Sequence, residues 1–194
     1  MVLDGSPFVK TLKQDRFAQC IPIIREEEGG NDDDPEDPGG RTSRGIIQRE
    51  YDAYRKLKGA TTRDVWTADE EEITDIYRHQ YWLPWCPMLP AGVDLLYFDM
   101  CVNVGHHEAT LLIQRAAHVH DDGHFGLVTL HSCLTANPII LISSVSHEKR
   151  VFYRKLRKFW KYGKGWFNRV REIEHDALLM VVAPDPGAPH VETA

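Results

Sequence analysis

Hydrophobic residues recur along this chain mostly three or four positions apart, which is the spacing of one face of an α-helix. Phe17, Ile21 and Ile24 share such a face and predict a helix from about residue 14 to residue 28. The same periodicity predicts later helices over residues 48–57, 67–81, 90–104, 108–118 and 137–162, and a last one after the glycines at 163 and 165. The pattern therefore predicts an all-α fold of about seven or eight helices with little or no sheet.

The longest polar interruption lies between residues 25 and 46. Gly29 and Gly30 are suited to end the first helix, because glycine adopts the left-handed conformation of a helix C-cap. Residues 26–37 contain eight acidic residues and no basic one. A carboxylate at a helix end that faces a polar loop suits glycoside hydrolysis, which needs a protonated carboxyl group beside the scissile oxygen. The alternatives for this loop are a solvated acidic turn or a calcium site, since calcium prefers closely spaced carboxylates.

The same segment resembles a known family. The shared motifs are Glu28-Gly29-Gly30, Asp34-Pro35-Glu36-Asp37-Pro38-Gly39-Gly40, Thr42 and Gly45-Ile46. They resemble the N-terminal signature of glycoside hydrolase family 108, the phage and bacterial N-acetylmuramidases, which usually have tyrosine where this chain has Asn31. Further similar motifs, Phe98-Asp99, Val102-Asn103 with Gly105, and Gly163-Lys164-Gly165-Trp166, extend the resemblance over roughly residues 14 to 181.

The resemblance implies that Glu28 is the catalytic acid in hydrolysis of the β-1,4 bond between N-acetylmuramic acid and N-acetylglucosamine. Asp37, Thr42 and Ser43 are the candidates for the group that handles water or shields the oxocarbenium-like state. A lytic transglycosylase acting on the same bond is an alternative, because it also uses one glutamate. A cell-wall-binding virion component without activity is the alternative from another class.

Two further regions are candidates for substrate contact. The resemblance places Tyr81 and Trp82 beside the sugar groove, where flat rings can stack on pyranose faces; the alternative is a buried aromatic corner. Asp99 and Asn103 are one helical turn apart on an otherwise apolar helix, so they need polar partners or a place in the cleft. Asn103 is the candidate for substrate and Asp99 the candidate for a structural contact.

The resemblance also implies the organisation of the chain. We expect a lysozyme-like catalytic part over residues 14–105 and a small helical peptidoglycan-binding lobe over residues 106–182. Residues 183–194 are rich in Pro and Ala and are predicted to be disordered.

Composition excludes several other classes. The net charge of −6 argues against general nucleic-acid binding. The cysteines are far apart, which argues against zinc and redox motifs and predicts reduced thiols; they are Cys20, Cys86, Cys101 and Cys133. The spacing of six histidines fits no standard ligand set, so we expect no metal and no cofactor; they are His106, His107, His118, His120, His124 and His131.

The chain opens without the charged and apolar segments of a signal peptide, and its apolar runs are too short to span a bilayer. We therefore expect no stable membrane insertion, a protein made in the host cytoplasm, and action in the periplasm or wall after a phage holin or a virion gives access to peptidoglycan. Residues 149–171 contain ten Lys or Arg and no acid. This basic stretch can meet anionic membranes or wall polymers, or can be the solvated side of a helix.

Overall fold

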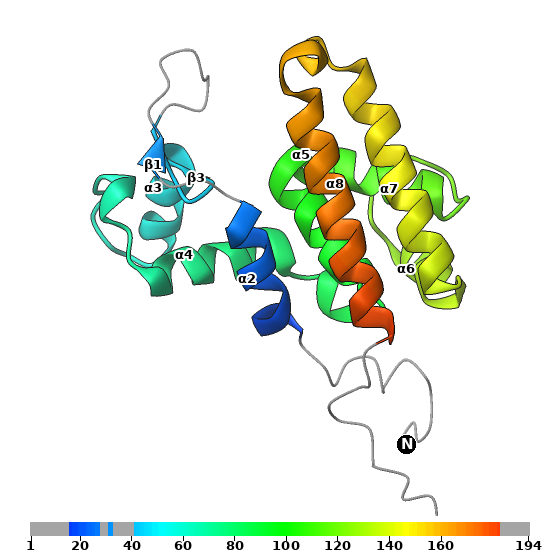
Figure 1. Cartoon of the computed structure of the whole chain (residues 1–194). Helices are drawn as coiled ribbons and strands as arrows, with labels where there is room; N and C mark the ends of the chain where they lie inside the picture. The colour runs from blue at the N-terminus through cyan, green and yellow to red at the C-terminus, as the bar shows by residue number, and fades with distance from the viewer. Residues whose placement is uncertain (1–15, 28–30, 33–40, 183–194) are drawn as a thin grey trace, which may run out of the picture.

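The structure, a computed structural model, describes residues 16–27, 31–32 and 41–182 (Figure 1). Helices make up most of these residues, and the predicted all-α, lysozyme-like fold is confirmed. The helices are α2 (Phe17–Glu27), α3 (Gln48–Leu57), α4 (Glu70–Ile76), α5 (Val93–Ala116), α6 (Leu127–Thr135), α7 (Pro138–Lys155) and α8 (Phe159–Val182). Shorter helical turns η1 (Val65–Thr67), η2 (Tyr77–Trp82) and η3 (Cys86–Met88) connect α3 to α5.

A small antiparallel sheet interrupts the helices. Its strands are β1 (Asn31–Asp32), β2 (Thr42–Ser43) and β3 (Ile46–Ile47), in the order β1-β2-β3. Asn31 pairs with Ser43, and Ser43 pairs with Ile46 on its other side. Strands of two residues give no readable alternation of polar and apolar positions, so the hydrophobic pattern did not predict the sheet.

The N-terminal helices match the prediction in position and differ in detail. α3 has the predicted bounds; Tyr51 is fully buried, whereas Leu57 at its end is 87% exposed. The helix predicted from residue 67 begins later, as α4 at Glu70, because Asp69 caps it: the Asp69 side chain accepts from the Glu72 backbone N–H, and the Glu72 side chain accepts from the Asp69 backbone N–H. This reciprocal capping box satisfies two backbone donors at once.

α5 replaces two predicted helices. It runs from Val93 to Ala116, and its one interruption is Gly105, whose φ of 80° and ψ of 160° are not helical. Most residues of its first three turns are buried, so α5 is central to the core. The predicted boundary between the catalytic part and the C-terminal lobe falls at this break, and the division into lobes stays a prediction.

The predicted helix over residues 137–162 is wrong at its end. α7 stops at Lys155, and α8 starts at Phe159 and continues through both glycines that were expected to break it. Leu156 has an extended backbone (φ −75°, ψ 135°), yet neither Gly nor Pro marks this turn in the sequence. Gly163 suits the helix because a Cβ there would lie 2.5 Å from the ring of Phe159. The turn is therefore fixed by packing and has no local sequence signal.

α7 and α8 form an antiparallel pair that packs against α5, while α2, α3, α4 and the sheet form the other side of the molecule (Figure 1). All four cysteines are buried. Burial raises the pKa of the Cys101 and Cys133 thiols to about 12, so neither is a reactive thiolate at neutral pH. Within the described residues, none of the helices combines the length and apolar character needed to cross a bilayer.

Candidate active site

A tight β-hairpin forms one side of the candidate site. Arg44 and Gly45 alone connect β2 to β3, and both have positive φ, 51° and 78°. Positive φ at both central residues is typical of the type I′ turn, whose twist matches that of paired strands. Glycine adopts this conformation readily, but arginine pays a steric cost. Arg44 is held in it by Tyr77, whose hydroxyl donates to the Arg44 carbonyl at 2.8 Å, and by its own bond to the Ala68 carbonyl at 2.6 Å.

Ion pairs connect this hairpin to the end of α2. Glu70, in the first turn of α4, accepts from Arg25 of α2 at 2.6 Å and pairs through its other oxygen with Arg44. The hydrogen bond from Arg25 and the charge of Arg44 outweigh partial burial and hold the pKa of Glu70 below its usual value. Glu70 thus remains ionised and ties together α2, the hairpin and α4.

A pocket of about 380 Å³ opens beside these ion pairs. It lies between the last two turns of α2, the hairpin and α4, and its lining residues are Ile21, Pro22, Arg25, Glu26, Arg44 and Thr74. The polar groups of this lining surround the end of α2, after which Glu28 follows in the chain.

Two of the predicted catalytic residues, Glu28 and Asp37, lie outside the described residues, as does most of the acidic loop considered as a calcium site. The described chain borders Glu28 on both sides, because α2 ends at Glu27 and β1 begins at Asn31. Residues 28–30 therefore connect the end of α2 to β1. In β1, Asn31 pairs with Ser43 of β2.

The structure separates the other two catalytic candidates. Ser43 has no exposed surface and lies between β1 and β3, with Arg44 Nε 3.4 Å from its hydroxyl. Thr42, one residue earlier, is partly exposed. Because neighbouring residues of a strand point to opposite faces, only one of the two can face solvent, and that residue is Thr42.

Trp66 is a site neighbour that the sequence analysis missed. Its indole N–H donates to the Thr42 carbonyl at 2.9 Å, and the Arg41 guanidinium lies 4.0 Å from its ring centroid. The ring is 38% exposed. The sequence did offer a sign of this role: Trp66 is a large aromatic residue in the polar stretch 61–72, which has no helical hydrophobic periodicity.

The aromatic segment after α4 divides into a core residue and a surface residue. Trp82 has no exposed surface and packs against Phe17 and Phe98 at ring-centroid distances of 5.7 and 5.3 Å. The predicted sugar contact of Trp82 is therefore contradicted by its position. Tyr81 is half-buried, donates to Glu50 at 3.0 Å and stacks on His106 at 6.1 Å. Of the predicted pair, Tyr81 alone has a surface that a ligand can reach.

Asn103 lies on the exposed side of α5. Its amide nitrogen donates to the Asp99 carbonyl at 2.8 Å and to the Asp99 carboxylate at 3.0 Å. Both bonds use the nitrogen, so the amide oxygen points away from Asp99 and remains available to a donor. This arrangement is compatible with substrate contact, and the role of Asn103 stays a prediction.

Asp99 is the centre of a buried ionic network. It has no exposed surface, and Lys149 of α7 and Arg169 of α8 both bind its carboxylate, Arg169 at 2.8 Å. Burial opposes ionisation of Asp99, but the charges of Lys149 and Arg169 outweigh it and keep the pKa of the carboxyl below its usual value. Asp99 therefore joins α5, α7 and α8 and orients Asn103.

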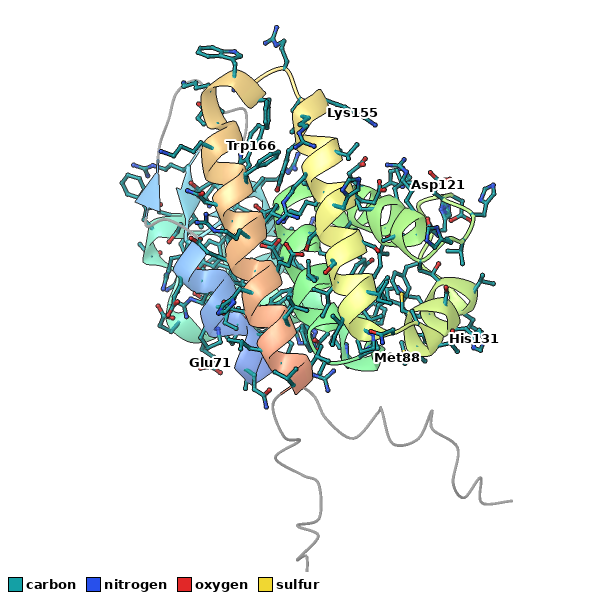
Figure 2. The ribbon with its side chains drawn as sticks, turned by 45° about the vertical axis from the view of Figure 1, so that its right-hand side comes forward. Glu71, Met88, Asp121, His131, Lys155 and Trp166 are labelled. Atoms are coloured by element: carbon teal, nitrogen blue, oxygen red, sulfur yellow. The ribbon has the colours of Figure 1, made fainter. Side chains whose placement is uncertain are left out.

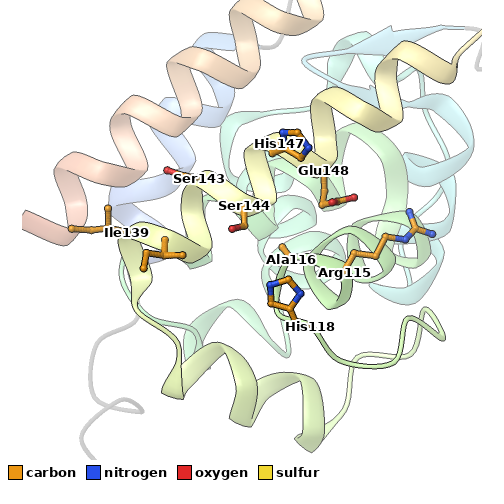
Figure 3. A pocket seen from close by; sticks show the side chains of 9 residues that line it. Arg115, Ala116, His118, Ile139, Ser143, Ser144, His147 and Glu148 are labelled. Atoms are coloured by element: carbon orange, nitrogen blue, oxygen red, sulfur yellow. The ribbon is translucent and has the colours of Figure 1, made fainter.

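The described residues contain no group of three His, Cys, Asp or Glu side chains placed to hold a metal ion. His118, His147 and Glu148 do line a common pocket of about 490 Å³ between the end of α5 and α7, as Figure 3 shows. The same lining includes the exposed apolar residues Ile139 and Ile140.

Comparison with known proteins gives the class to which this fold and site belong. The profile of the family described as Glycosyl hydrolase 108 matches residues 21–105, which include most of α2, the sheet, Glu28 and Asn103. The solved structure of SagA from Brucella abortus is 30% identical in sequence, with a TM-score of 0.76 over 86% of this chain and 96% of that chain. Among the curated proteins, nothing matches.

The fold and the site thus define a glycoside hydrolase of the muramidase type. The chain belongs to the glycosyl hydrolase 108 family.

Proposed function

We propose that this protein hydrolyses the β-1,4 bond between N-acetylmuramic acid and N-acetylglucosamine in peptidoglycan, with Glu28 as the general acid. The observation that carries the proposal is the family match over residues 21–105, in which Glu28 directly follows α2. The ion pairs of Glu70 support it, because they hold the end of that helix against the hairpin. A fixed helix end is what a general acid needs, since proton transfer requires placement within hydrogen-bond reach of the scissile oxygen.

The second catalytic group is expected among Asp37 and Thr42. A carboxylate such as Asp37 can activate water or shield positive charge on the sugar, and a hydroxyl such as that of Thr42 can position water. The full burial of Ser43 favours a structural role for this residue. Tyr81 and Asn103, both with accessible surface, are the proposed sugar contacts.

The central test is Glu28→Gln. The substitution nearly preserves shape and removes the transferable proton, so lysis of purified peptidoglycan should fall by about 10²–10⁴-fold while the unfolding midpoint stays unchanged. Glu71→Gln, an exposed carboxylate of α4, is the matched control and should retain full activity. Residual activity of Glu28→Gln above about a tenth of the parent would remove Glu28 from the acid role, since a general acid contributes more than this.

The products decide between hydrolysis and the transglycosylase alternative. Mass spectrometry of digested muropeptides should show reducing-end N-acetylmuramic acid, because an activated water adds across the cleaved bond. Products with a 1,6-anhydro ring, lighter by one water, would instead assign the protein as a lytic transglycosylase that uses the same glutamate.

We also propose that the protein acts as an endolysin that depends on a partner for access to the wall. Expressed alone in a Gram-negative host, it should accumulate without lysing the culture. Chloroform or a co-expressed holin should then cause rapid lysis that Glu28→Gln abolishes. Spontaneous lysis by the protein alone would show that no partner is needed.

A further inference from the structure

The connection between α7 and α8 forms a strongly basic surface, which we call the α7–α8 tip (residues 154–165). The chain has no acidic residue between Glu148 and Glu172, so every charged side chain of the tip is a cation. Six of these cations are exposed: Arg154, Lys155, Arg157, Lys158, Lys161 and Lys164. Figure 2 shows Lys155 and Trp166 near this end of the helix pair. The tip thus concentrates positive charge on a protein whose net charge is −6.

An exposed tryptophan lies within this basic surface. Trp160 is 85% exposed and Tyr162 is 38% exposed, and Lys161 lies 4.8 Å from the Tyr162 ring centroid. A large indole left in water forgoes the stabilisation that burial of an aromatic side chain gives. Trp and Tyr beside Lys and Arg are the side chains enriched at the interface between a bilayer and water.

The base of the tip is packed, so Trp160 extends from a defined platform. Tyr153 stacks on Trp166 at 5.0 Å, and Phe159 contacts Phe167 at 5.3 Å. Gly163 lies against the Phe159 ring, where a Cβ would approach within 2.5 Å. Tyr162 lies at the edge of this packing, 5.9 Å from the Trp166 ring, whereas Trp160 is 85% exposed and projects away from it.

We propose that the α7–α8 tip is a docking surface for an anionic phospholipid bilayer. The basic side chains supply attraction to the headgroups, and the Trp160 indole enters the interfacial region while the helices remain outside the bilayer. The charge favours lipid over a wall glycan, since a glycan site needs fixed acceptors as well as donors, and the charged groups of the tip are donors only. Docking on the membrane goes beyond the proposed hydrolase activity and does not depend on it.

Docking at the tip would also orient the enzyme. In Figures 1 and 2 the α7–α8 tip is the highest part of the described ribbon, and the sheet lies below it, near mid-height. A bilayer bound at the tip would therefore leave the hairpin of the candidate active site outside the bilayer.

The test is co-sedimentation of the full chain with vesicles of phosphatidylcholine containing about 30% phosphatidylglycerol, and with vesicles of phosphatidylcholine alone. We expect binding to the anionic vesicles only, weakening as salt is raised. Arg157→Glu with Lys158→Glu should weaken binding by more than tenfold, since each basic residue near an anionic surface contributes roughly fivefold. The matched control, Arg49→Glu with Lys56→Glu on α3, makes the same change in net charge at exposed positions and should bind as the parent does.

Trp160 gives an independent readout. Trp160→Phe should remove a blue shift of the tryptophan emission that anionic vesicles cause in the parent, while Leu57→Ala, an equally exposed apolar side chain, should keep it. Equal binding by the tip variant and the α3 control, or no binding to anionic vesicles, would overturn the proposal. The proposal would also be overturned if the tip variant lost binding to purified peptidoglycan and kept binding to vesicles, because the tip would then be a wall contact. Hydrolysis of purified peptidoglycan in the absence of vesicles should be unchanged in the tip variant, so these results are separate from those on Glu28.

Discussion

Two groups of ionic contacts in this molecule differ in burial, one on the N-terminal side and one around Asp99. On the N-terminal side (residues 16–92), ion pairs such as Arg25–Glu70, Arg41–Asp64 and Lys58–Asp75 each have a side chain more than a third exposed. On the C-terminal side (residues 93–182), Asp99 and Lys149 are almost completely buried, and Arg169 is nearly so. The candidate catalytic residues are on the N-terminal side, and the buried network is at the meeting point of three long helices.

This difference in burial predicts where the protein tolerates the loss of an ion pair. Exposed pairs contribute about 0–1 kcal/mol each, because water and salt screen them. Removing the partner of a buried charge lowers the free energy of unfolding by about 3–5 kcal/mol, because water cannot reach and solvate the charge that remains. The C-terminal side should therefore behave as a rigid support, while the hairpin and α2 are tied by contacts that are individually weak.

The largest expected effect is that of Asp99→Asn. Asparagine has nearly the same shape but leaves the buried Lys149 ammonium without a counter-charge, so the free energy of unfolding should fall by about 3–5 kcal/mol. Lys58→Met is the control, because Lys58 is 55% exposed in its pair with Asp75, and it should cost less than about 1 kcal/mol. Urea denaturation of both variants measures the difference. Similar losses in the two variants would show that burial does not distinguish the two sides.

A smaller effect is expected from the pH dependence of Asp94. Burial raises the pKa of this carboxyl to about 6, against the attraction of Arg16, whereas an unfolded Asp has a pKa of about 3.9. A raised pKa means that the folded state holds the proton more tightly. Asp94 therefore stabilises the fold fully below about pH 4, and this contribution is lost as the pH rises through about 6.

The size of the Asp94 effect follows from the shift of roughly two pKa units, which is about 3 kcal/mol. Asp94→Asn should remove this part of the pH dependence. As the pH rises from 4 to 7, the free energy of unfolding should therefore fall more in the parent than in the variant. Urea denaturation over this pH range measures it. Parallel stability profiles for parent and variant would show that Asp94 keeps an ordinary pKa in the fold.

The smallest expected effect is that of Arg25→Gln on the N-terminal side. It removes a pair with Glu70 in which Glu70 is 63% exposed, so the free energy of unfolding should fall by less than about 1 kcal/mol at low salt. Around 1 M salt the parent and variant should be indistinguishable, because the screening length is then about 3 Å. A loss that persists in high salt would place this pair with the buried network instead.

The sequence predicted much of the helical fold, and the reason is that helical periodicity is local. α3 has its predicted bounds, and the burial of Tyr51 and Ile24 follows from their spacing. The motif around Glu28 likewise identified the family, because its glycines and acids are adjacent in the chain. The start of α4 was predicted three residues too early, since Thr67 and Asp69 are both acceptable N-caps and only the reciprocal bond with Glu72 decides between them.

Tertiary structure decided the rest of the candidate site. Trp82 and Tyr81 are neighbours with similar chemistry, yet Phe17 and Phe98 bury the first and leave the second at the surface. The sequence could not assign the partner of Asp99, because Lys149 is 50 residues away. The turn between α7 and α8 contains no helix breaker, so its position depends on how the aromatic rings of the two helices pack. Local preference determined which segments are helical, and contacts between distant segments determined which side chains are buried, paired or exposed.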